Sequence, residues 1–145
     1  MQISKDTTHN SSSKNPTGKL TEKQIKLNFS EMHTPLTASQ ADIEASRCYY
    51  CYDAPCITAC PTGIDIPEFI KRIDTGNIKG SALKIFEQNI MGGMCARVCP
   101  TEVLCEGACV RNKHEDKSVA IGLLQRYATE EVIEMRGGQK RRSER

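Results

Sequence analysis

Long hydrophobic runs are missing from this sequence of 145 residues. No apolar stretch approaches the roughly 20 residues needed to cross a bilayer. The opening residues, MQISKDTTHNSSSKNPTGK, also contain no apolar core of a signal peptide. We therefore expect a cytoplasmic protein without a membrane partner, in a compartment where thiols stay reduced.

Bulky aromatic side chains are scarce as well, since the chain has no Trp and only 5% aromatic residues. With 38% hydrophobic residues, the chain is about the size of one domain with a modest core. Small domains of this kind often depend on disulfides or metals for stability. The chain has eight cysteines, and in a reducing compartment these are predicted to be metal or cofactor ligands rather than disulfides.

An excess of one charge is absent too, because the formal net charge is only +2. Basic residues gather in the final RGGQKRRSER, which we interpret as a solvated, disordered end and not as a nucleic-acid site. The sequence contains no G-x-G-x-x-G phosphate-binding pattern. It also contains no Ser/His/Asp, Cys/His or paired-carboxylate constellation, so no catalytic residue is predicted.

Periodicity divides the chain into three parts: a flexible N-terminal segment (1–19), a helical domain (20–136) and a basic disordered tail (137–145). Helices are predicted within 21–33, 37–48, 65–76, 77–89 and 118–136. In the third of these, Asp65 is the expected N-cap with Glu68 as its capping-box partner, and Gly76 ends the helix. The Gly92–Gly93 pair is expected to break the fourth. No segment alternates like a strand, so the predicted fold is all-α, with metal-binding loops between helices.

The eight cysteines form two groups, each containing a Cys-Pro pair. The first has the spacing C-x2-C-x4-C-x3-C-P (Cys48, Cys51, Cys56, Cys60), and the second C-x3-C-P-x4-C-x3-C (Cys95, Cys99, Cys105, Cys109). This pattern resembles the C-x2-C-x2-C-x3-C-P run of two-cluster ferredoxins, with a longer middle spacer. Two four-thiolate zinc sites would also use all eight cysteines. The spacing favours 4Fe-4S clusters over zinc, and both over disulfides.

Three stretches of the chain resemble a known family. They are ASRCYYCYDAPCITACPTGIDIPEFIKRI, GGMCARVCPTEVLCEGACV and IGLLQRYATE, and together they cover roughly residues 36–131. They are similar to the N-terminal iron-sulfur domain shared by dihydropyrimidine dehydrogenase and the small subunit of bacterial glutamate synthase. The IGLLQ motif resembles the dihydropyrimidine dehydrogenase branch, including the bacterial subunit that pairs with a separate flavin-bearing, pyrimidine-reducing subunit.

The resemblance implies a small α-helical ferredoxin-like domain with two 4Fe-4S clusters. It implies that Cys48, Cys51, Cys56 and Cys109 hold the first cluster, and that Cys60, Cys99, Cys105 and Gln125 hold the second. Cys60 and Cys109 would then each bind the cluster of the other group, as in ferredoxins. Spacing alone would have assigned Cys95, and not Gln125, to the second cluster, so Cys95 stays an alternative ligand.

The resemblance also implies partners. Electrons would pass between a flavin partner that uses NAD(P)H and a pyrimidine-reducing or glutamate synthase subunit, with FAD and NAD(P)H bound on a partner or on a missing domain. The chain would be a component of an oxidoreductase without a complete active site of its own. Two alternatives are a docking domain whose clusters mainly fix the fold and a zinc-binding adaptor. The electron donor and acceptor, NAD versus NADP, the oligomeric state and whether the chain is a fragment stay open.

Three arginines are close to cysteines in the sequence: Arg47, Arg97 and Arg111. They are expected either to offset the negative charge of a thiolate-bound cluster or to be ordinary solvated surface residues.

Overall fold

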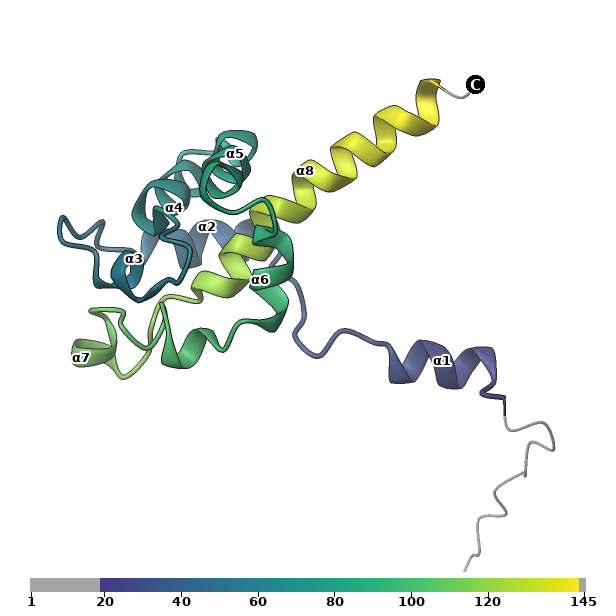
Figure 1. Ribbon diagram of the computed structural model, residues 1–145, viewed down its shortest axis with the longest axis horizontal. Coiled ribbons are helices and arrows are strands. Elements are labelled where there is room, and N and C mark those ends of the chain that lie inside the picture. The colour runs from purple at the N-terminus through teal and green to yellow at the C-terminus, as the bar shows by residue number, and fades with distance from the viewer. Residues whose placement is uncertain (1–18, 144–145) are drawn as a thin grey trace, which may run out of the picture. The chain divides into compact units, whose positions relative to one another are not determined.

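The computed structural model describes the backbone of residues 19–143 and the side chains of residues 19–133. All regular structure in this part of the chain is helical (Figure 1), which confirms the all-α prediction. Residues 1–18 of the predicted flexible segment lie outside the described residues, and the domain limits stay a prediction. The chain divides into two compact units, residues 1–34 and 35–145.

The described part of the first unit contains one helix, α1 (Glu22–Asn28). Thr21 caps it in a reciprocal capping box, because its side chain accepts from the backbone of Gln24 and its own backbone N–H donates to the Gln24 side chain. No residue of α1 is buried.

The second unit contains the remaining helices. They are α2 (Ala38–Ser46), α3 (Pro55–Ala59), α4 (Ile66–Asp74), α5 (Ile78–Gln88), α6 (Gly92–Val98), the 3-10 helix η1 (Thr101–Val103), α7 (Asn112–Glu115) and α8 (Ile121–Ser143). Helix α4 packs against α2 and α5, and α8 packs against α5 and α6. Their buried faces form one core, whose largest fully buried side chains include Phe69, Ile70, Ile73, Ile85 and Leu124.

Helix α4 begins and ends largely as its sequence predicts. The Asp65 side chain accepts from the Glu68 backbone N–H, and Gly76 follows the helix with a positive φ of 75°. The predicted reciprocal half of the capping box is not formed. The Glu68 carboxylate instead accepts a 2.8 Å hydrogen bond from Arg72, one turn further along the helix.

The Gly92–Gly93 pair corrects a prediction. Helix α5 ends before it, at Gln88, and the two glycines begin α6. A Cβ at Gly92 would lie 2.3 Å from Cγ2 of Ile85, so the residue is small because α6 approaches α5 closely. The glycine pair in the sequence predicts only that a helix ends. In the structure, a residue without a side chain is needed at the start of α6, because α6 packs closely against Ile85 of α5.

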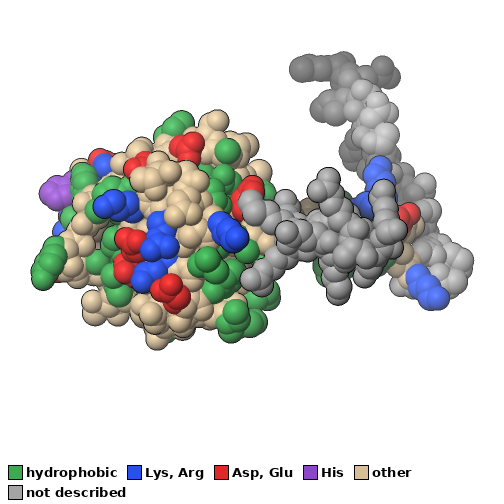
Figure 2. All heavy atoms as spheres, turned by 90° about the horizontal axis from the view of Figure 1, so that it is seen from above, with side chains coloured by type: hydrophobic (Ala, Val, Ile, Leu, Met, Phe, Trp, Pro, Cys, Tyr) green, Lys and Arg blue, Asp and Glu red, His purple; other side chains and the backbone are tan. Residues whose placement is uncertain are grey.

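Two surface properties are also visible. Within residues 19–143, no helix combines the length and apolar character needed to span a membrane. On the face of the second unit shown in Figure 2, acidic side chains lie next to basic ones.

Candidate metal centres

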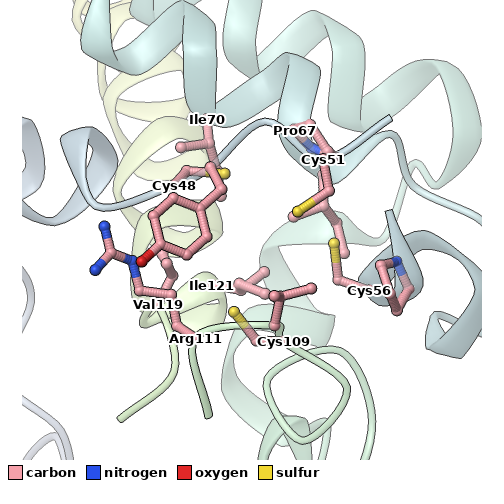
Figure 3. A pocket seen from close by; sticks show the side chains of 13 residues that line it. Cys48, Cys51, Cys56, Pro67, Ile70, Cys109, Arg111, Val119 and Ile121 are labelled. Carbon is pink, nitrogen blue, oxygen red and sulfur yellow. The ribbon is translucent and has the colours of Figure 1, made fainter. Parts of the chain in front are cut away.

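Four cysteines surround one cavity of the second unit (Figure 3). Cys48 follows α2, and its backbone N–H donates to the Ala45 carbonyl at 3.0 Å. Cys51 lies in the next loop, Cys56 in the first turn of α3, and Cys109 in the loop after η1. Residues 61 positions apart in the sequence, Cys48 and Cys109, thus reach the same cavity.

The loop that carries these cysteines turns through unusual backbone conformations. Tyr50 has φ 51° and Ala54 has φ 25°, both in the positive region that L-residues rarely adopt. The Tyr50 backbone N–H donates to Cys48 Sγ at 3.5 Å, and its hydroxyl donates to Asp74 of α4 at 3.1 Å. These contacts hold the strained loop against α4 and keep its thiols facing the cavity.

The rest of the first cavity is apolar, with one cation at its edge. Ile66, Pro67 and Ile70 of α4 line it. Arg111 also lines it, and its guanidinium lies over the Tyr49 ring, 4.1 Å from the ring centroid. Apolar walls lower the local dielectric, so a nearby positive charge acts more strongly there than in water.

Arg111 is held by further contacts. It donates through Nε to the Arg47 carbonyl and forms an ion pair with Glu115. Arg47 binds Glu44 and Glu115 and donates to the carbonyls of Lys117 and Ser118. Of the three arginines singled out from the sequence, only Arg111 is part of a cysteine cavity wall.

A second cavity is lined by the other four cysteines and one amide. The side chains are Cys60, Cys95, Cys99, Cys105 and Gln125. Cys60 directly follows α3, Cys99 directly follows α6, and Cys95 lies within α6 one turn before Cys99. The structure therefore brings together both Cys95 and Gln125, the two alternative ligands predicted for one position.

Gln125 is a buried polar residue of α8, with 7% of its surface exposed. Its Nε2 donates to the Gly92 carbonyl at 2.7 Å. This bond fixes the amide plane, and no group of the described residues donates a hydrogen bond to the amide oxygen. The oxygen is therefore the atom available for another partner.

Cys95 is half-buried and has its own hydrogen-bond donor. The Asn89 side-chain amide donates to Cys95 Sγ at 3.0 Å. The other end of the same amide, Oδ1, accepts from the Met91 backbone N–H at 2.9 Å. Asn89 is thereby fixed at both ends and holds the Cys95 sulfur in place beside the cavity.

The thiols of both cavities differ in acidity. Burial raises the pKa of Cys48, and raises the pKa values of Cys56 and Cys105 to about 12. Burial acts in the same direction on Cys60, but hydrogen bonds from the Thr62 side chain and nearby backbone N–H groups outweigh it and lower the pKa. Thiolates are the ligating form, so metal binding would release protons from the buried thiols.

One residue belongs to both cavities. Ile66, the first residue of α4, lines each of them and is 2% exposed. Ile66 is not among the residues predicted from the sequence to belong to a site. Its position in the sequence could have indicated this role, because Ile66 lies six residues after Cys60 and directly after the Asp65 cap, where a helix begins beside a ligand loop.

The cysteines line cavity walls and do not converge on a point. Among residues 19–133, no three His, Cys, Asp or Glu side chains form a group that could hold a single metal ion. The donors are instead spread around two cavities, each with four or more sulfur or amide groups.

Comparison with known proteins identifies the pattern. Residues 25–137 match the family model described as dihydropyrimidine dehydrogenase domain II, 4Fe-4S cluster. The chain is 50% identical over 97 residues to the NAD-dependent dihydropyrimidine dehydrogenase subunit PreT of Escherichia coli O157:H7, covering 67% of this chain and 23% of that protein. The corresponding figures for PreT of Escherichia coli strain K12 are 47% over 104 residues, 71% and 25%.

A more distant relative, UacF of Escherichia coli strain K12, is 36% identical over 118 residues, which cover 81% of this chain and 18% of that protein. The chain thus spans a quarter or less of the length of these relatives.

Proposed function

Since this chain belongs to the dihydropyrimidine dehydrogenase domain II family of 4Fe-4S domains, we propose that it is the electron-transfer module of an NAD(P)H-dependent oxidoreductase. In this proposal each cysteine cavity holds one 4Fe-4S cluster. The electron donor is a flavin on a partner domain or subunit, and the acceptor is a pyrimidine-reducing or glutamate-synthesising subunit. The name of the PreT relatives, NAD-dependent dihydropyrimidine dehydrogenase subunit, favours the pyrimidine-reducing acceptor.

The observation that carries the proposal is the exchange of one cysteine between the two groups. Cys60 comes from the first group but lines the second cavity, and Cys109 comes from the second group but lines the first. This three-plus-one arrangement is the one that two-cluster ferredoxins use. Among the described residues, no three His, Cys, Asp or Glu side chains form a group that could hold a single metal ion, which favours clusters over zinc.

The donor set of each cavity fits a cube with four iron corners. In the first cavity the ligands are the four thiolates of Cys48, Cys51, Cys56 and Cys109. In the second they are Cys60, Cys99 and Cys105, with the Gln125 amide oxygen as fourth ligand. When bound, such a cluster accepts and releases single electrons.

The other side chains around the cavities set the environment. Ile66 and Ile70 exclude water from the first cavity, and Ile64 and Leu104 do so in the second. Exclusion of water reduces the solvent reorganisation that accompanies a change in the charge of a cluster. The Arg111 guanidinium at the first cavity favours the more negative, reduced state there.

Metal analysis is the first test. The chain is purified without oxygen and its iron, acid-labile sulfide and zinc are measured. We expect about eight iron and about eight sulfide per chain, four of each for each cluster. Colourless protein that contains zinc and no sulfide would instead establish the zinc-adaptor alternative.

A redox titration separates electron transfer from a purely structural role. Adding NAD(P)H with a flavoprotein reductase should bleach the visible absorption of the clusters and produce the electron paramagnetic resonance (EPR) signals of reduced 4Fe-4S centres. Full iron content with no reduction, even by dithionite, would favour a docking domain whose clusters only fix the fold.

A further inference from the structure

The second cavity offers one donor more than a 4Fe-4S cluster takes. Its wall carries four cysteines and Gln125, whereas a cube binds four protein ligands, one for each iron. The first cavity carries four cysteines and no further donor of this kind. The surplus donor of the second cavity is Cys95.

Cys95 is placed to reach the same space as the assigned ligands. It lies one helical turn before Cys99, whose backbone N–H donates to the Cys95 carbonyl at 3.0 Å. Side chains one turn apart lie on the same face of a helix. Cys95 and Cys99 accordingly line one cavity from one face of α6.

A single short segment holds both competing donors. Asn89 donates to Cys95 Sγ at 3.0 Å, and the Gly92 carbonyl accepts from Gln125 Nε2 at 2.7 Å. The Gly92 backbone N–H in turn donates to the Asn89 carbonyl at 2.9 Å, which closes this segment into one turn. A small displacement of residues 89–92 therefore moves the sulfur and the amide together.

The chemistry of the two donors differs in charge. The Gln125 side chain is more than nine-tenths buried, and it binds as a neutral oxygen. Cys95 binds as a thiolate after losing its proton.

We propose that Cys95 is a reserve ligand of the second cluster and takes the fourth iron when Gln125 does not. The inference rests on the proposed function, because it requires a cluster in this cavity. In the exchange the Gln125 oxygen leaves as a neutral amide and Cys95 Sγ binds as it gives its proton to solvent. No electron is transferred, and the ligand set becomes one unit more negative.

The test compares Gln125→Leu, Cys95→Ser and the double variant in the full chain, purified without oxygen. Iron and sulfide are counted, and the midpoint potential and EPR spectrum of each cluster are measured. We expect each single variant to keep about eight iron and the double variant to fall to about four. We also expect Gln125→Leu to lower the potential of the second cluster, because a thiolate replaces an amide, and Cys95→Ser to leave that potential unchanged.

Three controls accompany these variants. Cys105→Ser removes the ligand of a different iron from the one that Gln125 binds, so Cys95 does not replace it, and the variant should lose the second cluster by itself. The EPR signal of the first cluster reports whether each variant has folded, and Gln125→Ala repeats the test with a smaller side chain.

Loss of the second cluster in both Gln125→Leu and Gln125→Ala, with the first cluster intact, would show that Cys95 does not replace the amide. An unchanged spectrum in both, together with cluster loss in Cys95→Ser, would make Cys95 the resident ligand and also overturn the inference. A wild-type chain with no second cluster contradicts the proposed function itself, and the iron count reveals this before any variant is made.

Discussion

The two cysteine cavities share the side chain of Ile66 but are built from different parts of the chain. Three of the four cysteines of the first cavity, Cys48, Cys51 and Cys109, lie outside helices, and the cavity contains no surplus donor. The second takes two of its five donors from within helices, since α6 supplies Cys95 and α8 supplies Gln125, and Cys99 directly follows α6. In a loop each thiol is positioned separately. In a helix, side chains one turn apart share a face, so a second donor can line the same cavity.

The cavities also limit negative charge in different ways. The first combines four thiols with the Arg111 guanidinium at its edge. The second also has four thiols in its wall, and in the proposed ligand set the neutral amide of Gln125 takes the place of one of them. An adjacent cation and a neutral ligand both make a thiolate-bound cluster easier to reduce. In this proposal, Arg111 has that effect on the first cluster and Gln125 on the second.

The exchanged cysteines allow the largest test of this comparison. Cys109→Ser should abolish the first cluster and Cys60→Ser the second, and each should lower the iron content from about eight to about four per chain. The reason is that Cys109 belongs to the second sequence group but completes the first cavity, and Cys60 belongs to the first group but completes the second. Iron analysis and EPR of the reduced protein measure the effect.

Two further variants serve as controls for this exchange. Cys51→Ser should give the spectrum of Cys109→Ser, and Cys99→Ser that of Cys60→Ser. If Cys109→Ser instead matches Cys99→Ser, each cluster is held within its own sequence group and the proposed exchange is wrong.

The shared wall can be tested by Ile66→Ala. Truncating this buried side chain should lower the free energy of unfolding by about 2–5 kcal/mol and should alter the EPR spectra of both clusters. Ile70→Ala is the matched control, because Ile70 is equally buried and lines only the first cavity. Denaturant unfolding under anaerobic conditions gives the energies; a change confined to one spectrum in Ile66→Ala would contradict the shared wall.

Gly92→Ala should disturb the second cavity selectively. The new Cβ would clash with Ile85 at 2.3 Å and shift α6, with an expected loss of about 1–3 kcal/mol in unfolding free energy. Gly93→Ala is the control, since its Cβ would come no closer than 3.3 Å to Thr129 and alanine favours the helix. Equal destabilisation by both substitutions would argue against the close approach as the cause.

The smallest expected effect concerns charge at the first cavity. Arg111→Met removes a cation, so the reduced state is less favoured and the potential of the first cluster should fall by roughly 10–50 mV, a modest change because Glu115 already pairs with Arg111. The potential of the second cluster should not change. Arg97→Met is the control, since Arg97 pairs with Glu130 and lines neither cysteine cavity; spectroelectrochemistry measures all of these potentials.

Local features of the fold could be predicted from the sequence, and features of packing could not. The Asp65 cap and the turn at Gly76 depend on neighbours within a few residues, and both are present in the structure. The role of Gly92 depends on Ile85 of another helix. A glycine pair therefore indicated a helix break where it begins a helix.

The candidate site follows the same division. Spacing predicted that the cysteines act as ligands, but it does not say which cavity Cys60 or Cys109 enters, because that depends on how the loops fold back. The resemblance to a family implied the exchange, and the structure brings these residues to the expected cavities. Tyr49, which lies under Arg111, gave no sequence signal, because the pair forms between loops 62 residues apart.

The exchange of Cys60 and Cys109 also determines when each cavity has its thiols during synthesis. A ribosome makes the first group of cysteines early, yet their cavity lacks its fourth thiol until Cys109 has been added. The second cavity has all four of its thiols once Cys105 is made, before Gln125 is translated. The second cavity, whose first cysteine comes later in the chain, is therefore the first to have four thiols available to bind iron and sulfide.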